Sequence, residues 1–64
     1  MNAQELVDEY RRAVTDWTRQ LLVWEGTEPG SADSGHELEA LNRIIRNAYR
    51  LEDRIVAVIG ERNA

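Results

Sequence analysis

The chain has 64 residues, a formal net charge of −4 and 42% hydrophobic residues, and it contains no cysteine. This length allows one domain at most, 1–64, whose small core needs a staple or a partner to be stable. Without cysteine, disulfides and thiolate zinc sites are excluded, and no run of about 18 apolar residues is present to span a membrane. The acidic, polar start of the chain is unlike a secretory signal, so we expect a cytoplasmic location.

The charges are distributed unevenly along the chain. All eight basic residues are arginine, and five of them lie in residues 40–64, which carry a net charge of +2. Residues 26–39 hold four acids and no base, which gives this segment a net charge of −4. Because the chain as a whole is acidic, its field opposes nucleic acid, and a nucleic-acid partner is disfavoured.

Residues 3–25 have the apolar pattern of an amphipathic helix. Apolar residues recur at alternating spacings of four and three, as in a coiled coil, and Leu6 and Ala13 widen one edge of the stripe. Asn2 is placed to cap the start of this helix, and Gly26 stands where a left-handed C-terminal cap is typical. The stripe consists of Ala3, Val7, Tyr10, Val14, Trp17, Leu21 and Trp24.

Residues 26–35 are predicted to form the loop that follows this helix. They contain three of the four glycines and the only proline. Ser34 and Glu37 have the spacing of a capping box, in which the serine side chain accepts a hydrogen bond from the glutamate amide. This box predicts that a second helix begins near residue 36.

Residues 36–60 form the second predicted helix, and Gly60 is expected to mark its end. Its apolar stripe is wide, covering about half of the helix circumference. The centre of the stripe is Leu41, Ile44, Ala48, Leu51, Ile55 and Val58, and its adjacent edge is Leu38, Ile45, Tyr49, Val56 and Ile59.

Two long helices joined by one loop predict an all-α fold, an antiparallel two-helix hairpin. A hairpin covers only one side of each stripe, so we expect two copies to dimerise into a four-helix bundle. A complex with another helical protein is the alternative. The expected oligomer interface consists of Val7, Tyr10, Val14, Trp17, Leu21, Trp24, Leu41, Ile45, Ala48, Glu52, Ile55 and Ile59.

Glu52 lies inside the apolar arc of the second helix. One interpretation is a charge that fixes the register of the assembly, paired with Arg11 of the facing helix or with an arginine of a partner. The other is a partly desolvated carboxylate with a raised pKa, as catalysis or ligand binding requires. We favour the structural interpretation, because an unpaired buried charge is costly and a partner is expected in either case.

Three other groups of residues are candidates for binding. Arg43, Arg46, Arg50 and Arg54 form a row on the far side of the second helix. The favoured interpretation is a solvated face with intrahelical ion pairs to Glu39 and Asp53, and the alternative is a site that binds phosphate groups. Leu22 and Val23 lie off the main stripe of the first helix and could dock a partner or gain burial in the bundle. His36 matches no metal-ligand motif, so no metal is expected there.

The sequence therefore favours a non-enzymatic helical module that dimerises and contacts another protein, as small accessory or adaptor proteins do. Catalytic residues, cofactors and metals are not expected, because no nucleophile is paired with a base. The first alternative is a small helical-bundle enzyme or ligand-binding protein that uses Glu52 and Arg11. The second is a nucleic-acid-binding helix that uses the arginine row.

Overall fold

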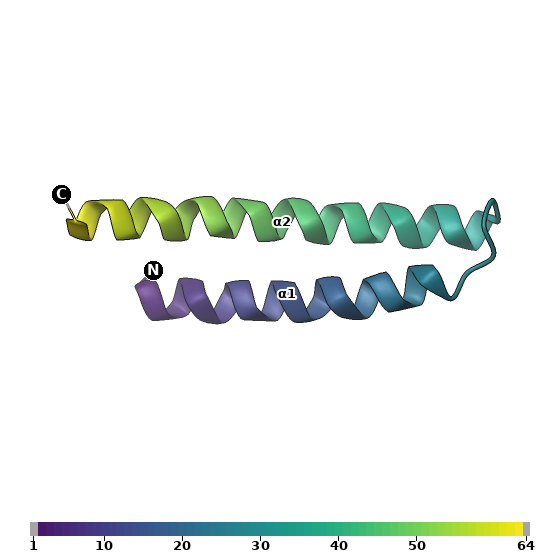
Figure 1. Ribbon diagram of the computed structural model, residues 1–64, viewed down its shortest axis with the longest axis horizontal. Helices are drawn as coiled ribbons and strands as arrows, with labels where there is room; N and C mark the ends of the chain where they lie inside the picture. Colours follow the sequence, from purple (N-terminus) through teal and green to yellow (C-terminus); the bar gives the residue numbers. More distant parts are fainter. Residues whose placement is uncertain (1, 64) are drawn as a thin grey trace.

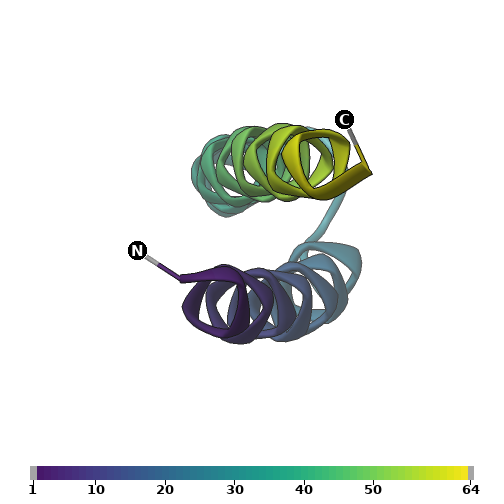
Figure 2. The same ribbon diagram turned by 90° about the vertical axis from the view of Figure 1, so that its left-hand side faces the viewer.

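The computed structural model describes residues 2–63 and consists of two helices, α1 (Ala3–Glu25) and α2 (Ala32–Asn63). They run antiparallel and pack side by side as a hairpin, joined by a loop of residues 26–31 (Figure 1). The hairpin measures 49 × 15 × 15 Å, so it is a single layer of two helices, as the view along the axes shows (Figure 2). The prediction of an all-α hairpin is confirmed.

The start of α1 is capped as the sequence predicts. The side chain of Asn2 accepts a hydrogen bond from the backbone amide of Glu5 at 2.8 Å. This bond satisfies one of the amides that the first turn of a helix leaves without a partner. Glu5 itself lies in the first turn, where its negative charge stabilises the positive end of the helix dipole.

The end of α1 differs from the prediction of a left-handed glycine cap. Gly26 has φ −77° and ψ −7°, which is right-handed. The carbonyl of Trp24 instead accepts two hydrogen bonds from Thr27, at 3.0 Å from its amide and 2.6 Å from its hydroxyl. The left-handed conformation falls at Gly30, with φ 81°, where the chain turns back toward α2. Gly26 is still the C-cap, since its amide donates to the Leu22 carbonyl at 3.1 Å, but it caps the helix in a right-handed conformation.

The second helix begins at Ala32, four residues before the predicted start, because Ser31 and not Ser34 caps it. The Ser31 hydroxyl accepts from the Ser34 amide at 3.1 Å and donates to the Glu28 carbonyl at 2.7 Å. Ser34 is thus inside the first turn. The helix also continues through Gly60 to Asn63, because glycine lowers helix propensity by only about 1 kcal/mol relative to alanine and does not by itself end a helix. The C-terminal turns of α2 extend beyond the start of α1 (Figure 1).

The buried core of the hairpin is centred one residue away from the predicted stripe of α1. Leu6 and Ala13, expected at its edge, are buried, whereas Val14 is exposed and Val7 and Leu21 are only partly buried. Ala13 is small, so it lets the helices approach, and larger side chains pack around it. The buried residues are Leu6, Ala13, Leu41, Ala48 and Leu51, and Tyr10, Trp17, Ile55 and Val58 pack against them.

Both helices are amphipathic, and each keeps polar side chains on its outer side. Within residues 2–63, neither helix has a stretch that is long and apolar enough to cross a lipid bilayer.

Replacing Ser31 with alanine should destabilise the hairpin by about 1 kcal/mol, because it removes the N-cap of α2. Ser34→Ala should change stability much less, since alanine is a good helix former in the first turn. Thermal unfolding of the two variants and the wild type, followed by circular dichroism, measures the difference. A larger loss for Ser34→Ala than for Ser31→Ala would place the start of the helix near residue 36.

Candidate functional site

One side of the hairpin carries a row of apolar side chains, interrupted on α2 by Glu52, that no other element covers. Most of these residues follow a residue of the hairpin core by one position, as Val14 follows Ala13 and Tyr49 follows Ala48. One residue is a rotation of 100°, and in antiparallel helices the same rotation leads to the same side of the pair. We call this side the apolar face; it consists of Val7, Val14, Leu21, Leu38, Ile45, Tyr49, Val56 and Ile59.

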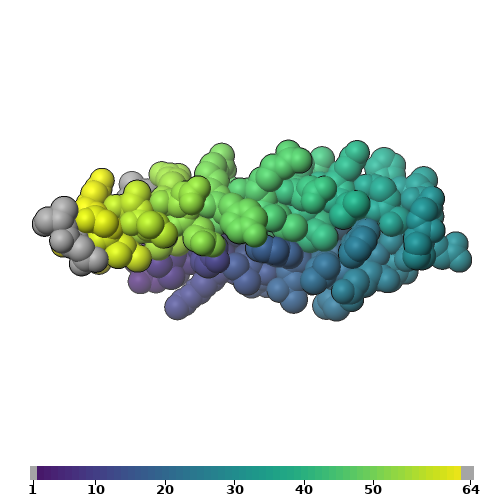
Figure 3. All heavy atoms as spheres, turned by 45° about the horizontal axis from the view of Figure 1, so that its top comes forward, coloured from purple at the N-terminus to yellow at the C-terminus, as the bar shows by residue number. Residues whose placement is uncertain are grey.

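The apolar face is largely open to solvent in the single hairpin. The exposed fraction is 56% for Tyr49, 62% for Val56 and 52% for Ile59. Figure 3 shows the two helices meeting along one junction, with the side chains of α2 standing over those of α1. Single exposed apolar residues are ordinary, but a contiguous row of them is typical of an interaction site.

Aromatic rings hold part of this face in place. The rings of Trp17 and Tyr49 lie with centroids 6.1 Å apart and planes at 68°, an edge-to-face arrangement. Such a pair stabilises by about 0.5–1.5 kcal/mol beyond its burial. Tyr49 is therefore anchored on Trp17 while more than half of its surface remains available for contact.

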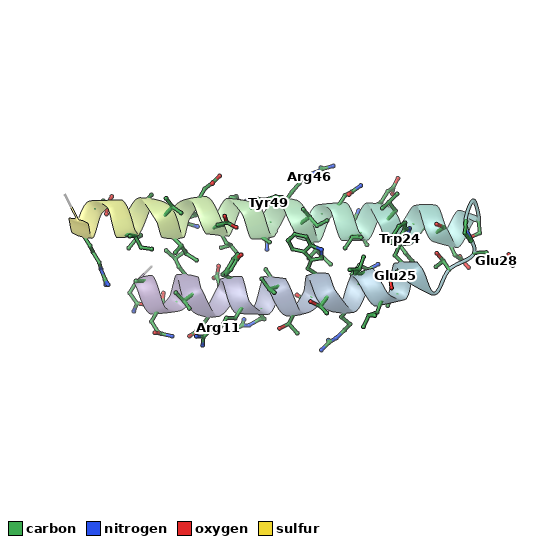
Figure 4. All side chains as sticks on the ribbon, viewed as in Figure 1. Arg11, Trp24, Glu25, Glu28, Arg46 and Tyr49 are labelled. Atoms are coloured by element: carbon green, nitrogen blue, oxygen red, sulfur yellow. The ribbon has the colours of Figure 1, made fainter. Side chains whose placement is uncertain are left out.

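Glu52 lies at the apolar face, as predicted, but its surroundings differ from the expectation. The side chain is exposed, and it accepts a hydrogen bond from the Tyr10 hydroxyl at 3.3 Å. Arg11 is exposed on the outer side of α1 and points away from α2 (Figure 4). Among the described residues no ion pair forms within 4.0 Å. The expectation of an Arg11–Glu52 pair within one hairpin is thus wrong, because α1 directs Arg11 outward, and the Glu52 carboxylate is exposed in the single hairpin.

The contact with Glu52 changes the acidity of Tyr10. Its pKa lies above the ordinary value of 10.0, first because the hydroxyl is partly desolvated between the helices. The negative charge of Glu52 and the hydrogen bond to it raise the pKa further, and Tyr49 adds a smaller repulsion. The neutral hydroxyl is therefore the form that the hairpin favours.

A polar link near the loop was not predicted. Gln20 is partly buried in the row of core positions that includes Leu6 and Ala13, and its Nε2 donates to the Glu37 backbone carbonyl at 3.0 Å. The same nitrogen also donates to the Glu37 carboxylate. The seven-residue repeat from Leu6 through Ala13 to Gln20 is the signal that could have identified this position. The link joins the two helices at the loop end and fixes their register.

The arginine row lies on α2, on the side away from α1, and Figure 4 shows Arg46 pointing outward. All four arginines are exposed, and Arg50 donates to the Asn47 side chain at 2.9 Å. The expected ion pairs to Glu39 and Asp53 do not form among the described side chains, because the arginines extend into solvent. A shallow hollow lies between Arg43, Arg46, Asn47 and Arg50.

The remaining candidates lie near the loop end. Leu22 is 65% exposed and Val23 is also exposed, and neither belongs to the row of the apolar face. Trp24 is partly buried and lines an open hollow with Pro29 and Gly30. His36 is exposed, and within the described residues no group of three metal-ligating side chains comes together.

Comparison of the chain with models of known protein families, with curated proteins and with solved structures finds no match. The function of the site is therefore inferred from its own residues. The feature that unites most of them is the uncovered apolar face, with Tyr49 and the Tyr10–Glu52 pair upon it.

Replacing Glu52 with glutamine should lower the pKa of Tyr10, because it removes the negative charge that opposes ionisation. The pKa of Tyr10 in the folded hairpin is higher than the value of 10.0 expected for the unfolded chain. The stability that the neutral Tyr10 hydroxyl contributes is therefore fully present below pH 10 and is lost as the pH rises through the pKa of the folded state. Titration of tyrosinate absorbance in a Tyr49→Phe background follows Tyr10 alone. An unchanged Tyr10 titration in the Glu52→Gln variant would show that the two side chains are apart in solution.

Proposed function

We propose that this protein is a non-enzymatic helical module that dimerises into a four-helix bundle and contacts another protein with the surface left outside the bundle. The observation that carries the proposal is the uncovered apolar face. Tyr49 and Val56 expose more than half of their surface in a single hairpin. Burial of such residues is the main favourable term in association, so leaving them in water is unfavourable.

The size of the surface supports a second copy as the cover. The hairpin exposes 4966 Å², whereas a folded chain of its mass of 7.4 kDa is expected to expose about 4,200 Å². The difference is close to the roughly 800 Å² that each partner buries in a standard interface. Burial of one interface of ordinary size would therefore reduce the accessible surface area of each chain to the value typical of its mass.

Two further surfaces remain for a protein partner. Leu22 and Val23 lie outside the apolar face, and so does the row Arg43, Arg46, Arg50 and Arg54. The four guanidinium groups are exposed, which suits a partner that carries carboxylates. The alternative of a ligand site built on Glu52 and Arg11 needs these side chains to converge, and Arg11 points away from α2 in the hairpin (Figure 4).

Sedimentation equilibrium at micromolar concentration tests the proposal. We expect a species of twice the chain mass of 7.4 kDa, with the helical circular dichroism of a folded hairpin. The second copy supplies the burial that two helices alone do not reach. A folded species of 7.4 kDa that persists on dilution would show that the hairpin is stable with its apolar face in water, and would contradict self-association.

A further inference from the structure

We propose that two copies pack through their apolar faces with their loops at opposite ends, around a two-fold axis that passes beside Val14. This arrangement rests on the proposed self-association and adds which surface is buried and how the copies are oriented. It is argued from the positions of the apolar residues along each helix, from the exposed area and from the distribution of charge.

The two halves of the apolar face are centred at the same level of the hairpin. On α1 the face runs from Val7 to Leu21, with Val14 at its midpoint. On α2 the row from Leu38 to Val56 has its midpoint at Asn47, next to Ala48, and Ile59 lies beyond it. Ala48 belongs to the same buried cluster as Ala13, the neighbour of Val14. A two-fold interface requires a self-complementary surface, and a face with a common centre meets this requirement.

In this orientation the symmetry pairs apolar residues of the two copies. With the axis beside Val14, this residue meets its own copy, and Val7 of one chain meets Leu21 of the other. On α2, Leu38 comes to the level of Val56 in the second copy, and Ile45 to the level of Tyr49 there. Every apolar position of the face except the terminal Ile59 thus faces an apolar position, in the way that packed helices interdigitate.

Charge distinguishes this orientation from the one with both loops at the same end. The loop end carries Glu25, Glu28, Asp33, Glu37 and Glu39 without any arginine. Two such ends side by side would repel each other, because their separation is comparable to the Debye length of about 10 Å at 0.1 M salt. With the loops at opposite ends, each acidic tip lies beside the end of the second copy that is nearly neutral. There, residues 1–14 and 48–64 hold six acids and five arginines, whereas residues 15–47 hold six acids and three arginines.

Single cysteines test the orientation cleanly, because the chain has none of its own. Val14 is 38% exposed, so Val14→Cys should leave the hairpin folded. Under mild oxidation most of this variant should become a disulfide-linked dimer, since the two cysteines face each other at the axis. Leu22→Cys, on α1 but outside the face, should remain unlinked as the matched control.

The face itself is tested by Val56→Glu with Leu22→Glu as its control, since both positions are strongly exposed and neither change disturbs the hairpin core. Burial of an unpaired carboxylate should raise the dimer dissociation constant about tenfold or more for Val56→Glu and leave it unchanged for Leu22→Glu.

The outcomes separate the two proposals. A monomeric wild type overturns self-association, and the interface with it. A dimeric wild type whose Val14→Cys variant stays unlinked, or links no faster than Leu22→Cys, overturns the orientation. A dimer that is weakened by Leu22→Glu and not by Val56→Glu overturns the choice of face while leaving self-association standing.

Discussion

A helix that packs against a single neighbour can bury only one stripe of its surface, and this constraint governs the whole molecule. In this hairpin the stripe is built on small residues, Ala13 and Ala48, with Leu6 and Leu51 on the same side of the helices. The small residues allow close approach of the helices. As a result, side chains one position further around each helix lie outside the contact, and an apolar face remains in water.

The side chains on and beside this face are suited both to contact with water in the single hairpin and to burial in an interface. Tyr10 and Tyr49 each combine an apolar ring with a hydroxyl, and Trp17 supports Tyr49 edge-on. Glu52 is held by the Tyr10 hydroxyl without being desolvated. Because Glu52 follows the core residue Leu51 by one position, it lies in the row of the apolar face, and an assembly that covers this face must leave its carboxylate hydrated or supply a hydrogen-bond donor.

Much of the fold could be predicted from the sequence, because the seven-residue apolar repeats and the single Gly/Pro-rich segment determine two helices and a loop. The start of α2 could not be predicted, because Ser31 and Ser34 are both plausible N-caps. Which serine caps the helix depends on the hydrogen bond that the Ser31 hydroxyl donates to the Glu28 carbonyl. The rotation of α1 was also ambiguous. Its apolar stripe is wider than one contact, and only packing against α2 determines that Ala13 is buried and Val14 is not.

The candidate site could be predicted only in part, again because the packing of α1 against α2 is not visible in the sequence. Glu52 was recognised as unusual from its place in the apolar arc, but its partner Tyr10 depends on the register between the helices. Gln20 was missed, because a polar residue at a core position is visible only once the true seam of α1 is known.

The most direct test of the central claim, that a second copy completes the core, is the dependence of thermal unfolding on protein concentration. The fluorescence of Trp17 and Trp24 reports unfolding over a hundredfold range of concentration. If folding and dimerisation are coupled, mass action should raise the midpoint temperature by about 10 °C over this range. A midpoint that is identical at every concentration would contradict the claim and show that the two helices are stable with their apolar face uncovered.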